Sequence, residues 1–145
     1  MQDTRSFWDT SAIVPTLVFQ TSSKSASALL RKHKKLVLAW ITRIEIYSAI
    51  CRLARQGILD NKNYTIAVDR FTRIEKNRIE VFPTETLRAL SIDLLQQYEL
   101  RAADAMQLAS ALIWCNEKPS KKTFITFDEQ LALAAAQVGF VVLGI

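Results

Sequence analysis

At 145 residues, half of them hydrophobic and with only three glycines and three prolines, the chain is expected to form one folded domain rather than a disordered segment. The single histidine, His33, and two cysteines without a partner motif, Cys51 and Cys115, argue against a histidine-based triad, a zinc site and a disulfide. The net charge of +5 suits a polyanionic partner, and the lack of a signal peptide or a membrane-length apolar run predicts a cytoplasmic protein.

The first predicted element is a short apolar strand at residues 7–8, and Asp9 follows it at once. The two hydroxyl residues after Asp9 are expected to cap a helix over residues 12–19, whose first turn contains Pro15. A carboxylate at the carboxyl end of a buried strand lies where open α/β sheets place their ligands. An ordinary aspartate in a strand-to-helix turn is the simpler explanation for Asp9 taken alone.

A second helix is expected over residues 22–34, followed by a buried parallel strand at residues 36–39. Thr42 and Glu45 then match a capping box, in which Thr42 caps the next helix and Glu45 lies three residues further on. Gly57 is expected to end that helix. The capping box alone explains a glutamate at this position, so a functional role for Glu45 stays open here.

The middle of the chain predicts a helix over residues 60–77, a strand at residues 79–82 and a further helix capped by Thr84. Residues 100–112 are almost all small or apolar, so their helix is expected to be buried on most of its surface. Asp104 near its start is therefore anomalous, because a buried carboxylate is costly unless it is paired or bound to a metal. A simple helix N-cap, favoured by the helix dipole, is the alternative explanation.

The last part of the chain repeats the arrangement of the first. Residues 123–127 predict a strand, and Asp128 follows that strand directly, as Asp9 follows the first strand. A helix over residues 129–138 and a last strand at residues 140–143 complete the pattern. Strands alternate with helices throughout, which predicts an α/β domain with a mostly parallel sheet.

Four acidic side chains are expected to meet at one edge of this sheet: Asp9, Glu45, Asp104 and Asp128. Each pair of such charges about 4 Å apart costs roughly 4 kcal/mol at an effective dielectric constant of about 20. We expect this repulsion to raise the pKa of at least one aspartate, and we expect protons or a divalent cation to offset it. An all-oxygen site suits Mg²⁺ or Mn²⁺, which activate water for phosphodiester cleavage.

The four acids lie in short motifs that resemble those of PIN-domain ribonucleases, and most closely those of the VapC toxins of bacterial and archaeal toxin–antitoxin pairs. These motifs are Asp9-Thr10-Ser11-Ala12, Thr42-Arg43-Ile44-Glu45, residues 100–109 and Thr126-Phe127-Asp128, with Leu131 after the last. The resemblance covers essentially the whole chain in the right order and spacing, so residues 1–145 are expected to be one PIN domain. Gln107 is a departure, because many relatives have histidine there, but we do not expect it to abolish metal binding.

The resemblance implies a five-stranded parallel sheet of order 3-2-1-4-5 with helices on both faces. It implies a metal-dependent endoribonuclease, with Mg²⁺ or Mn²⁺ as the cofactor. It also implies a homodimer that a small antitoxin holds inactive. The residues implied as metal-binding and catalytic are Asp9, Glu45, Asp104 and Asp128, and those implied as supporting hydroxyls are Ser11 and Thr126.

Arg43 and Arg52 are the best candidates for contacts with RNA phosphates, because they lie on the helix that carries Glu45. Further basic candidates are Lys32, Lys34, Lys35, Arg55, Lys121 and Lys122. Two alternatives stay open. One is a structure-specific DNA nuclease of the same fold, which usually carries extra acids and insertions. The other is an RNA-binding module without catalysis, which is expected to lack some of the four acids.

Overall fold

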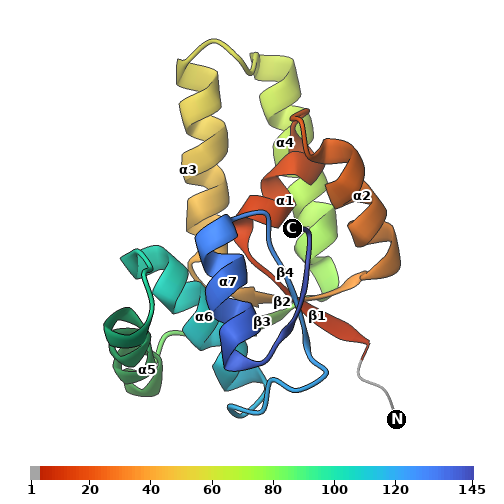
Figure 1. The fold of residues 1–145 in the computed structure, drawn as a ribbon. Coiled ribbons are helices and arrows are strands. Elements are labelled where there is room, and N and C mark those ends of the chain that lie inside the picture. The colour runs from red at the N-terminus through yellow and green to blue at the C-terminus, as the bar shows by residue number, and fades with distance from the viewer. Residues whose placement is uncertain (1–3) are drawn as a thin grey trace.

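The computed structural model describes residues 4–145, which fold around a five-stranded parallel sheet (Figure 1). The strands are β1 (Arg5–Trp8), β2 (Lys35–Ala39), β3 (Ile79–Val81), β4 (Thr123–Ile125) and β5 (Val141–Leu143). Strand β1 lies at the centre and pairs in parallel with β2 on one side and with β4 on the other. The strand order β3-β2-β1-β4-β5 confirms the predicted topology.

Helices connect the strands and cover both faces of the sheet. They are α1 (Thr10–Leu17), α2 (Ser23–Lys32), α3 (Thr42–Arg55), α4 (Asn61–Ile74), the 3₁₀ helix η1 (Glu75–Asn77), α5 (Glu85–Gln97), α6 (Ala102–Trp114) and α7 (Glu129–Val138). Figure 1 shows α3 and α4 as a hairpin that extends from the sheet, with α5 and α6 at the opposite end of the molecule. No helix in the described part of the chain has the length and apolar character needed to cross a membrane.

The alternation of side chains along β1 divides the core into two layers. Phe7 packs in the layer formed with α5, α6 and α7, and Trp8 packs in the layer formed with α1, α3 and α4. The Phe7 ring stacks on Phe124 of β4 with the ring centroids 5.1 Å apart, and both side chains are fully buried. Apolar packing on both faces therefore holds β1 and β4 firmly, and their carboxyl ends position the loops that follow.

The start of α1 differs from the prediction. The helix begins at Thr10, not near Ala12, because the Asp9 carboxylate is itself the N-cap and accepts a hydrogen bond from the backbone N–H of Ser11. Pro15 lies inside the helix rather than in its first turn. It removes one hydrogen bond to the preceding turn, while its buried ring contributes to packing.

The capping box predicted for α3 is wrong. The N-cap of this helix is Ile41, and no side chain makes a capping hydrogen bond there. The hydroxyl of Thr42 instead accepts a hydrogen bond from Gln107 of α6 at 3.0 Å. Since Glu45 does not serve as a capping residue, the capping box no longer explains its presence.

Strand β4 is shorter than predicted, and it ends at Ile125 instead of residue 127. The backbone N–H of Thr126 bonds to the carbonyl of Leu143, and the chain then turns toward α7. Gly144 makes this arrangement possible, because it has φ of +111° and a Cβ there would lie 2.1 Å from the Thr126 carbonyl oxygen. Residues 126–128 therefore form a loop against which the C-terminal residues pack closely.

Candidate active site: the acidic cleft

A cleft of about 760 Å³ is lined by all four of the acidic residues singled out in the sequence. Asp9 follows β1 and Asp128 lies in the loop after β4, and these two strands are direct neighbours. Glu45 comes from the first turn of α3, and Asp104 comes from the first turn of α6. Four separate segments of the chain thus bring carboxylates to the acidic cleft at one edge of the sheet.

Asp9 is the most buried of these acids, with 4% of its surface exposed. Its Oδ1 accepts a hydrogen bond from the Ser11 hydroxyl at 2.8 Å, and its Oδ2 accepts one from the Ser11 backbone N–H at 3.3 Å. Burial raises the pKa of Asp9 to about 7, although hydrogen bonds from Ser11 and Thr126 oppose that rise. The charge of Asp128 contributes least, so desolvation, and not the predicted mutual repulsion, is the main cause.

The hydroxyls of Ser11 and Thr126 connect the start of α1 with the loop before α7. Ser11 Oγ, which donates to Asp9, also accepts a hydrogen bond from the Phe127 backbone N–H at 2.9 Å. Thr126 Oγ1 lies 3.2 Å from Ser11 Oγ and accepts a hydrogen bond from the Asp128 backbone N–H at 3.0 Å. Both hydroxyls therefore help to set the positions of Asp9 and Asp128.

Glu45 is held by side chains from two other helices. Its Oε1 accepts hydrogen bonds from Thr10 Oγ1 at 2.9 Å and from Gln107 Nε2 at 2.6 Å. Gln107 is almost completely buried, with 1% of its surface exposed. The sequence did not indicate that Thr10 and Gln107 contact Glu45, because these residues are 35 and 62 positions away from it.

Asp104 is not the N-cap of α6, which is Arg101, but it lies in the first turn of that helix, where the helix dipole favours an acid. Burial raises the pKa of Asp104, and the charges of Asp128 and, more weakly, Glu45 act in the same direction. Arg101 opposes the rise through its backbone N–H and its positive charge. Asp128 does act as a cap, because its Oδ1 accepts a hydrogen bond from the first turn of α7 at 2.9 Å.

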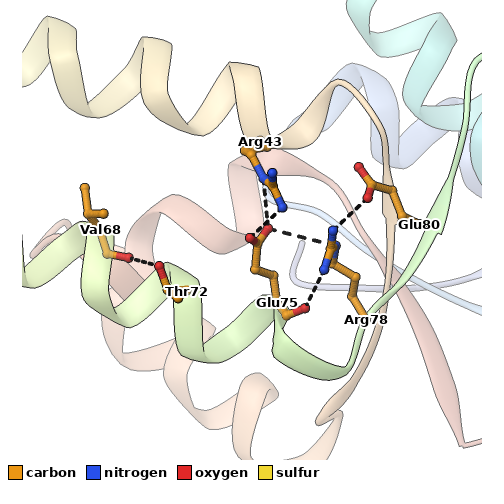
Figure 2. Close-up of polar contacts among 6 residues, drawn as sticks. All are labelled: Arg43, Val68, Thr72, Glu75, Arg78 and Glu80. Carbon is orange, nitrogen blue, oxygen red and sulfur yellow. Dashed lines mark hydrogen bonds and ion pairs between the residues drawn. The ribbon is translucent and has the colours of Figure 1, made fainter.

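Two arginines line the acidic cleft, and they are Arg52 of α3 and Arg101 at the start of α6. Arg101 was not singled out from the sequence, although its place one turn before Asp104 was a usable signal. Arg43 is not among the residues that line the cleft. Its guanidinium pairs with Glu75, with Nη2 2.8 Å from Oε1, in a network that includes Arg78 (Figure 2).

The lysine candidates at the strand starts lie away from the acids. Lys34 and Lys35 are at the start of β2, and Lys121 and Lys122 directly precede β4. Because all the strands are parallel, these four lysines mark the amino edge of the sheet, whereas the acidic cleft is at the carboxyl edge. The structure therefore does not bring them together with the four acids.

The oxygen donors of the cleft fit a hard divalent cation that keeps part of its water shell. Among residues 4–145, no three His, Cys, Asp or Glu side chains are arranged to hold an ion by themselves. Mg²⁺ commonly keeps several waters and binds only one or two carboxylates, so an incomplete protein shell suits it. The buried Asp9 and the half-buried Asp104, whose pKa values are raised, both gain from a nearby positive charge.

The sequence and the fold of this chain are similar to those of known proteins. The PIN domain family matches residues 7–137. Comparison with curated proteins gives no match.

Three solved structures share the fold with this chain. FitAcB from Neisseria gonorrhoeae has a TM-score of 0.65 at 19% identity, over 94% of this chain and 95% of that chain. A toxin–antitoxin complex from Klebsiella pneumoniae has a TM-score of 0.59 at 17% identity, and the match covers 88% of this chain and 90% of that chain. PAE2754 from Pyrobaculum aerophilum has a TM-score of 0.62 at 14% identity, and the match covers 98% of this chain and 92% of that chain.

Proposed function

The chain belongs to the PIN domain family, and from this premise we propose that it is a cytoplasmic metal-dependent endoribonuclease, the toxin of a type II toxin–antitoxin pair. The observation that supports this proposal most strongly is the acidic cleft, in which four carboxylates meet although they come from four segments of the chain. Like charges gathered in this way oppose folding unless they bind a cation or protons. The presence of all four acids in one cleft is better explained by a metal-dependent reaction than by fold stability.

The residues that would hold Mg²⁺ or Mn²⁺ are Asp9, Glu45, Asp104 and Asp128. When bound, the ion would supply an activated water and offset negative charge at the phosphodiester. The Ser11 and Thr126 hydroxyls keep Asp9 in place by hydrogen bonds and favour its charged form. The same two hydroxyls fix the loop that carries Asp128, so the two strand-end carboxylates keep one relative position.

Arg52 and Arg101 are the cations that we propose for RNA binding, because both line the acidic cleft. An RNA phosphate placed at the four acids would be repelled, so positive charges on the same cleft are needed to retain the backbone. An RNA contact from Arg43 stays a prediction, and it would require this side chain to leave or share its ion pair with Glu75.

We also propose that a small antitoxin inhibits the enzyme by placing a basic side chain among the four acids. The acidic cleft favours such a contact electrostatically, and one solved structure of the same fold is described as a toxin–antitoxin complex. We propose a homodimer as well. Exposed apolar side chains on α5, with Ile92 at 49% and Leu95 at 41% exposure, are candidates for that interface.

Substrate cleavage distinguishes the proposal from its two alternatives. Purified protein is incubated with Mg²⁺, Mn²⁺ or chelator and with a labelled RNA, the single-stranded DNA of the same sequence, or a branched DNA duplex. We expect RNA cleavage with either metal and none with chelator. Preferential cutting of branched DNA would favour the DNA nuclease. RNA binding without cleavage in any metal would favour the non-catalytic module.

Toxicity is tested in cells. Expression of the protein alone should arrest growth, and co-expression of the small gene next to it should relieve the arrest. The Asp9→Asn protein, expressed at the same level, serves as the control. Normal growth with abundant, folded parent protein would contradict the toxin proposal while leaving the nuclease proposal intact.

A further inference from the structure

We propose that Gln107 is a positioning residue that fixes the carboxylate of Glu45 in the acidic cleft. This inference rests on the proposed function only in assuming that Glu45 serves a bound cation. The geometry itself is independent of that assumption. Gln107 is a buried polar side chain on α6, and the other buried residues of that helix are small or apolar, for example Leu108 and Ala111.

The amide nitrogen of Gln107 reaches three acceptors. It lies 2.6 Å from Glu45 Oε1, 3.0 Å from Thr42 Oγ1 and 3.4 Å from Thr10 Oγ1. The Gln107 atom that faces Glu45 is the amide nitrogen, which donates the hydrogen bond to the carboxylate oxygen. The shortest of the three contacts is the one to the carboxylate oxygen of Glu45.

Thr10 adds a second contact to the same carboxylate oxygen. Its hydroxyl donates to Glu45 Oε1 at 2.9 Å, so the hydrogen bonds from Thr10 and Gln107 converge on one oxygen of Glu45. Neither of them engages the other oxygen, Oε2, which remains available as a ligand. A glutamate side chain has several rotatable bonds, and these two donors remove much of that freedom before any cation binds.

Thr42 in turn holds Gln107. Its hydroxyl accepts from Gln107 Nε2 and lies 3.5 Å from Gln107 Oε1, and its side chain is fully buried. The contact joins α6 to the start of α3, one turn before Glu45. The direction of the Gln107 amide is therefore set by a partner on the same helix that presents Glu45.

A purely structural role makes a different prediction from a positioning role. If Gln107 only joins α3 to α6, its replacement lowers stability but leaves cation affinity and turnover of the folded protein unchanged. If it positions Glu45, the folded protein binds Mn²⁺ more weakly and turns over more slowly, while its affinity for RNA is retained. Residues that orient metal ligands typically change metal affinity or activity by about 10- to 100-fold when removed.

The test uses Gln107→Met, which keeps the length and shape of the side chain and removes the donor. Its matched control is Ser110→Ala, one turn further along α6, where a buried hydroxyl donates to the Met106 carbonyl and forms no other hydrogen bond within residues 4–145. Mn²⁺ binding to the RNA-free proteins is measured by the electron paramagnetic resonance of free Mn²⁺. Cleavage of a labelled RNA gives kcat and KM separately, and circular dichroism confirms folding.

We expect Gln107→Met to bind Mn²⁺ about 10-fold or more weakly and to lower kcat by a similar factor, with KM for RNA within about twofold. Gln107→His, which keeps an N–H donor, should recover a large part of both losses. Ser110→Ala should behave as the parent. A folded Gln107→Met protein with parental Mn²⁺ affinity and kcat would overturn the proposal.

A second variant covers the case in which the methionine protein does not fold. Gln107→Asn keeps the amide but withdraws it by one carbon–carbon bond, about 1.5 Å, and should weaken Mn²⁺ binding in the same direction. If the parent neither binds Mn²⁺ nor cleaves RNA, the proposed function fails, and crystal structures then decide this inference. A displaced Glu45 carboxylate in the variant supports it, and an unchanged one contradicts it.

Discussion

Asp9 serves both as the N-cap of α1 and as a member of the acidic cleft. Capping favours the charged carboxylate, because the helix N-terminus presents free N–H groups and a positive dipole end. Burial favours the neutral acid and raises the pKa of Asp9 to about 7. At neutral pH the two forms are therefore close in free energy, and a cation in the cleft would shift the balance to the carboxylate.

The pH dependence of stability follows from this residue. Between the unfolded pKa of 3.8 and the folded pKa of about 7, the folded protein binds more protons than the unfolded chain. The stabilisation is complete below the unfolded pKa and is lost as pH rises through the folded pKa. At about 1.4 kcal/mol per pKa unit, the loss amounts to a few kcal/mol at most.

We predict that Asp9→Asn removes most of this pH dependence and makes the metal-free protein more stable than the parent at pH 8. Urea unfolding of both proteins at pH 5 and pH 8 in chelator provides the measurement, with Asp93→Asn on the exposed face of α5 as control. The pKa of Asp104 is also raised in the folded protein, so some pH dependence of stability remains in the Asp9→Asn protein. Parallel pH profiles in parent and Asp9→Asn would show that the burial of Asp9 does not set its pKa.

At the scale of elements, hydrophobic periodicity was sufficient to predict the helices and strands, and their alternation predicted a mostly parallel sheet. The strand order 3-2-1-4-5 came from the family resemblance and not from the pattern. The strand-end positions of Asp9 and Asp128 bring them together only because β1 and β4 are neighbours, which the family resemblance implied and the structure confirms. The local sequence pattern gave a wrong prediction at the start of α3. Thr42 and Glu45 do not form a capping box there, because their side chains form hydrogen bonds with residues that are distant in sequence. Such long-range partners leave no local signal, which is why the contact of Gln107 with Glu45 was not predicted.

The C-terminal segment determines the shape of the loop after β4. Gly144 has φ of +111° and lies so close to Thr126 that an added Cβ meets its backbone at 2.1 Å. Gly144→Ala should therefore move the backbone at Thr126, disturb the hydrogen bonds to Ser11 and Asp128, and lower both stability and RNA cleavage.

The matched control is Gly57→Ala, where φ is also positive but no atom lies within 4 Å of the added Cβ. Gly57→Ala is therefore expected to lower the free energy of unfolding only through the strained backbone conformation, by roughly 1 kcal/mol. Thermal melting and cleavage rates are compared for the two variants. If Gly144→Ala melts and cleaves as Gly57→Ala does, the close approach to Thr126 has no consequence for the site.

On the scale of the whole molecule, the net charge of +5 is unevenly distributed. The carboxyl edge of the sheet carries the four acids with Arg52 and Arg101 beside them, whereas the lysines at the start of β2 and before β4 mark the amino edge. The affinity for RNA at the cleft therefore depends on few nearby cations, and we expect each of them to contribute measurably to that affinity.

We predict that Arg52→Gln and Arg101→Gln each weaken RNA binding and each lower the slope of log affinity against log salt concentration by about one. Arg43→Gln should change the slope less, because that side chain is paired with Glu75. The measurement is fluorescence anisotropy of a labelled RNA at several salt concentrations in Ca²⁺ or chelator, without cleavage. A larger effect at Arg43 than at Arg52 and Arg101 would place the RNA away from the acidic cleft.

The central claim is that the four acids of the cleft act together in metal-dependent RNA cleavage. It is tested most directly by single-turnover cleavage of one labelled RNA in Mn²⁺, with the amide variants Asp9→Asn, Glu45→Gln, Asp104→Asn and Asp128→Asn and with Asp93→Asn as control. We predict that each of the four loses about 100-fold or more in rate while remaining folded, and that the control cleaves at the parental rate. Parental rates in two or more of the four folded variants would contradict the account.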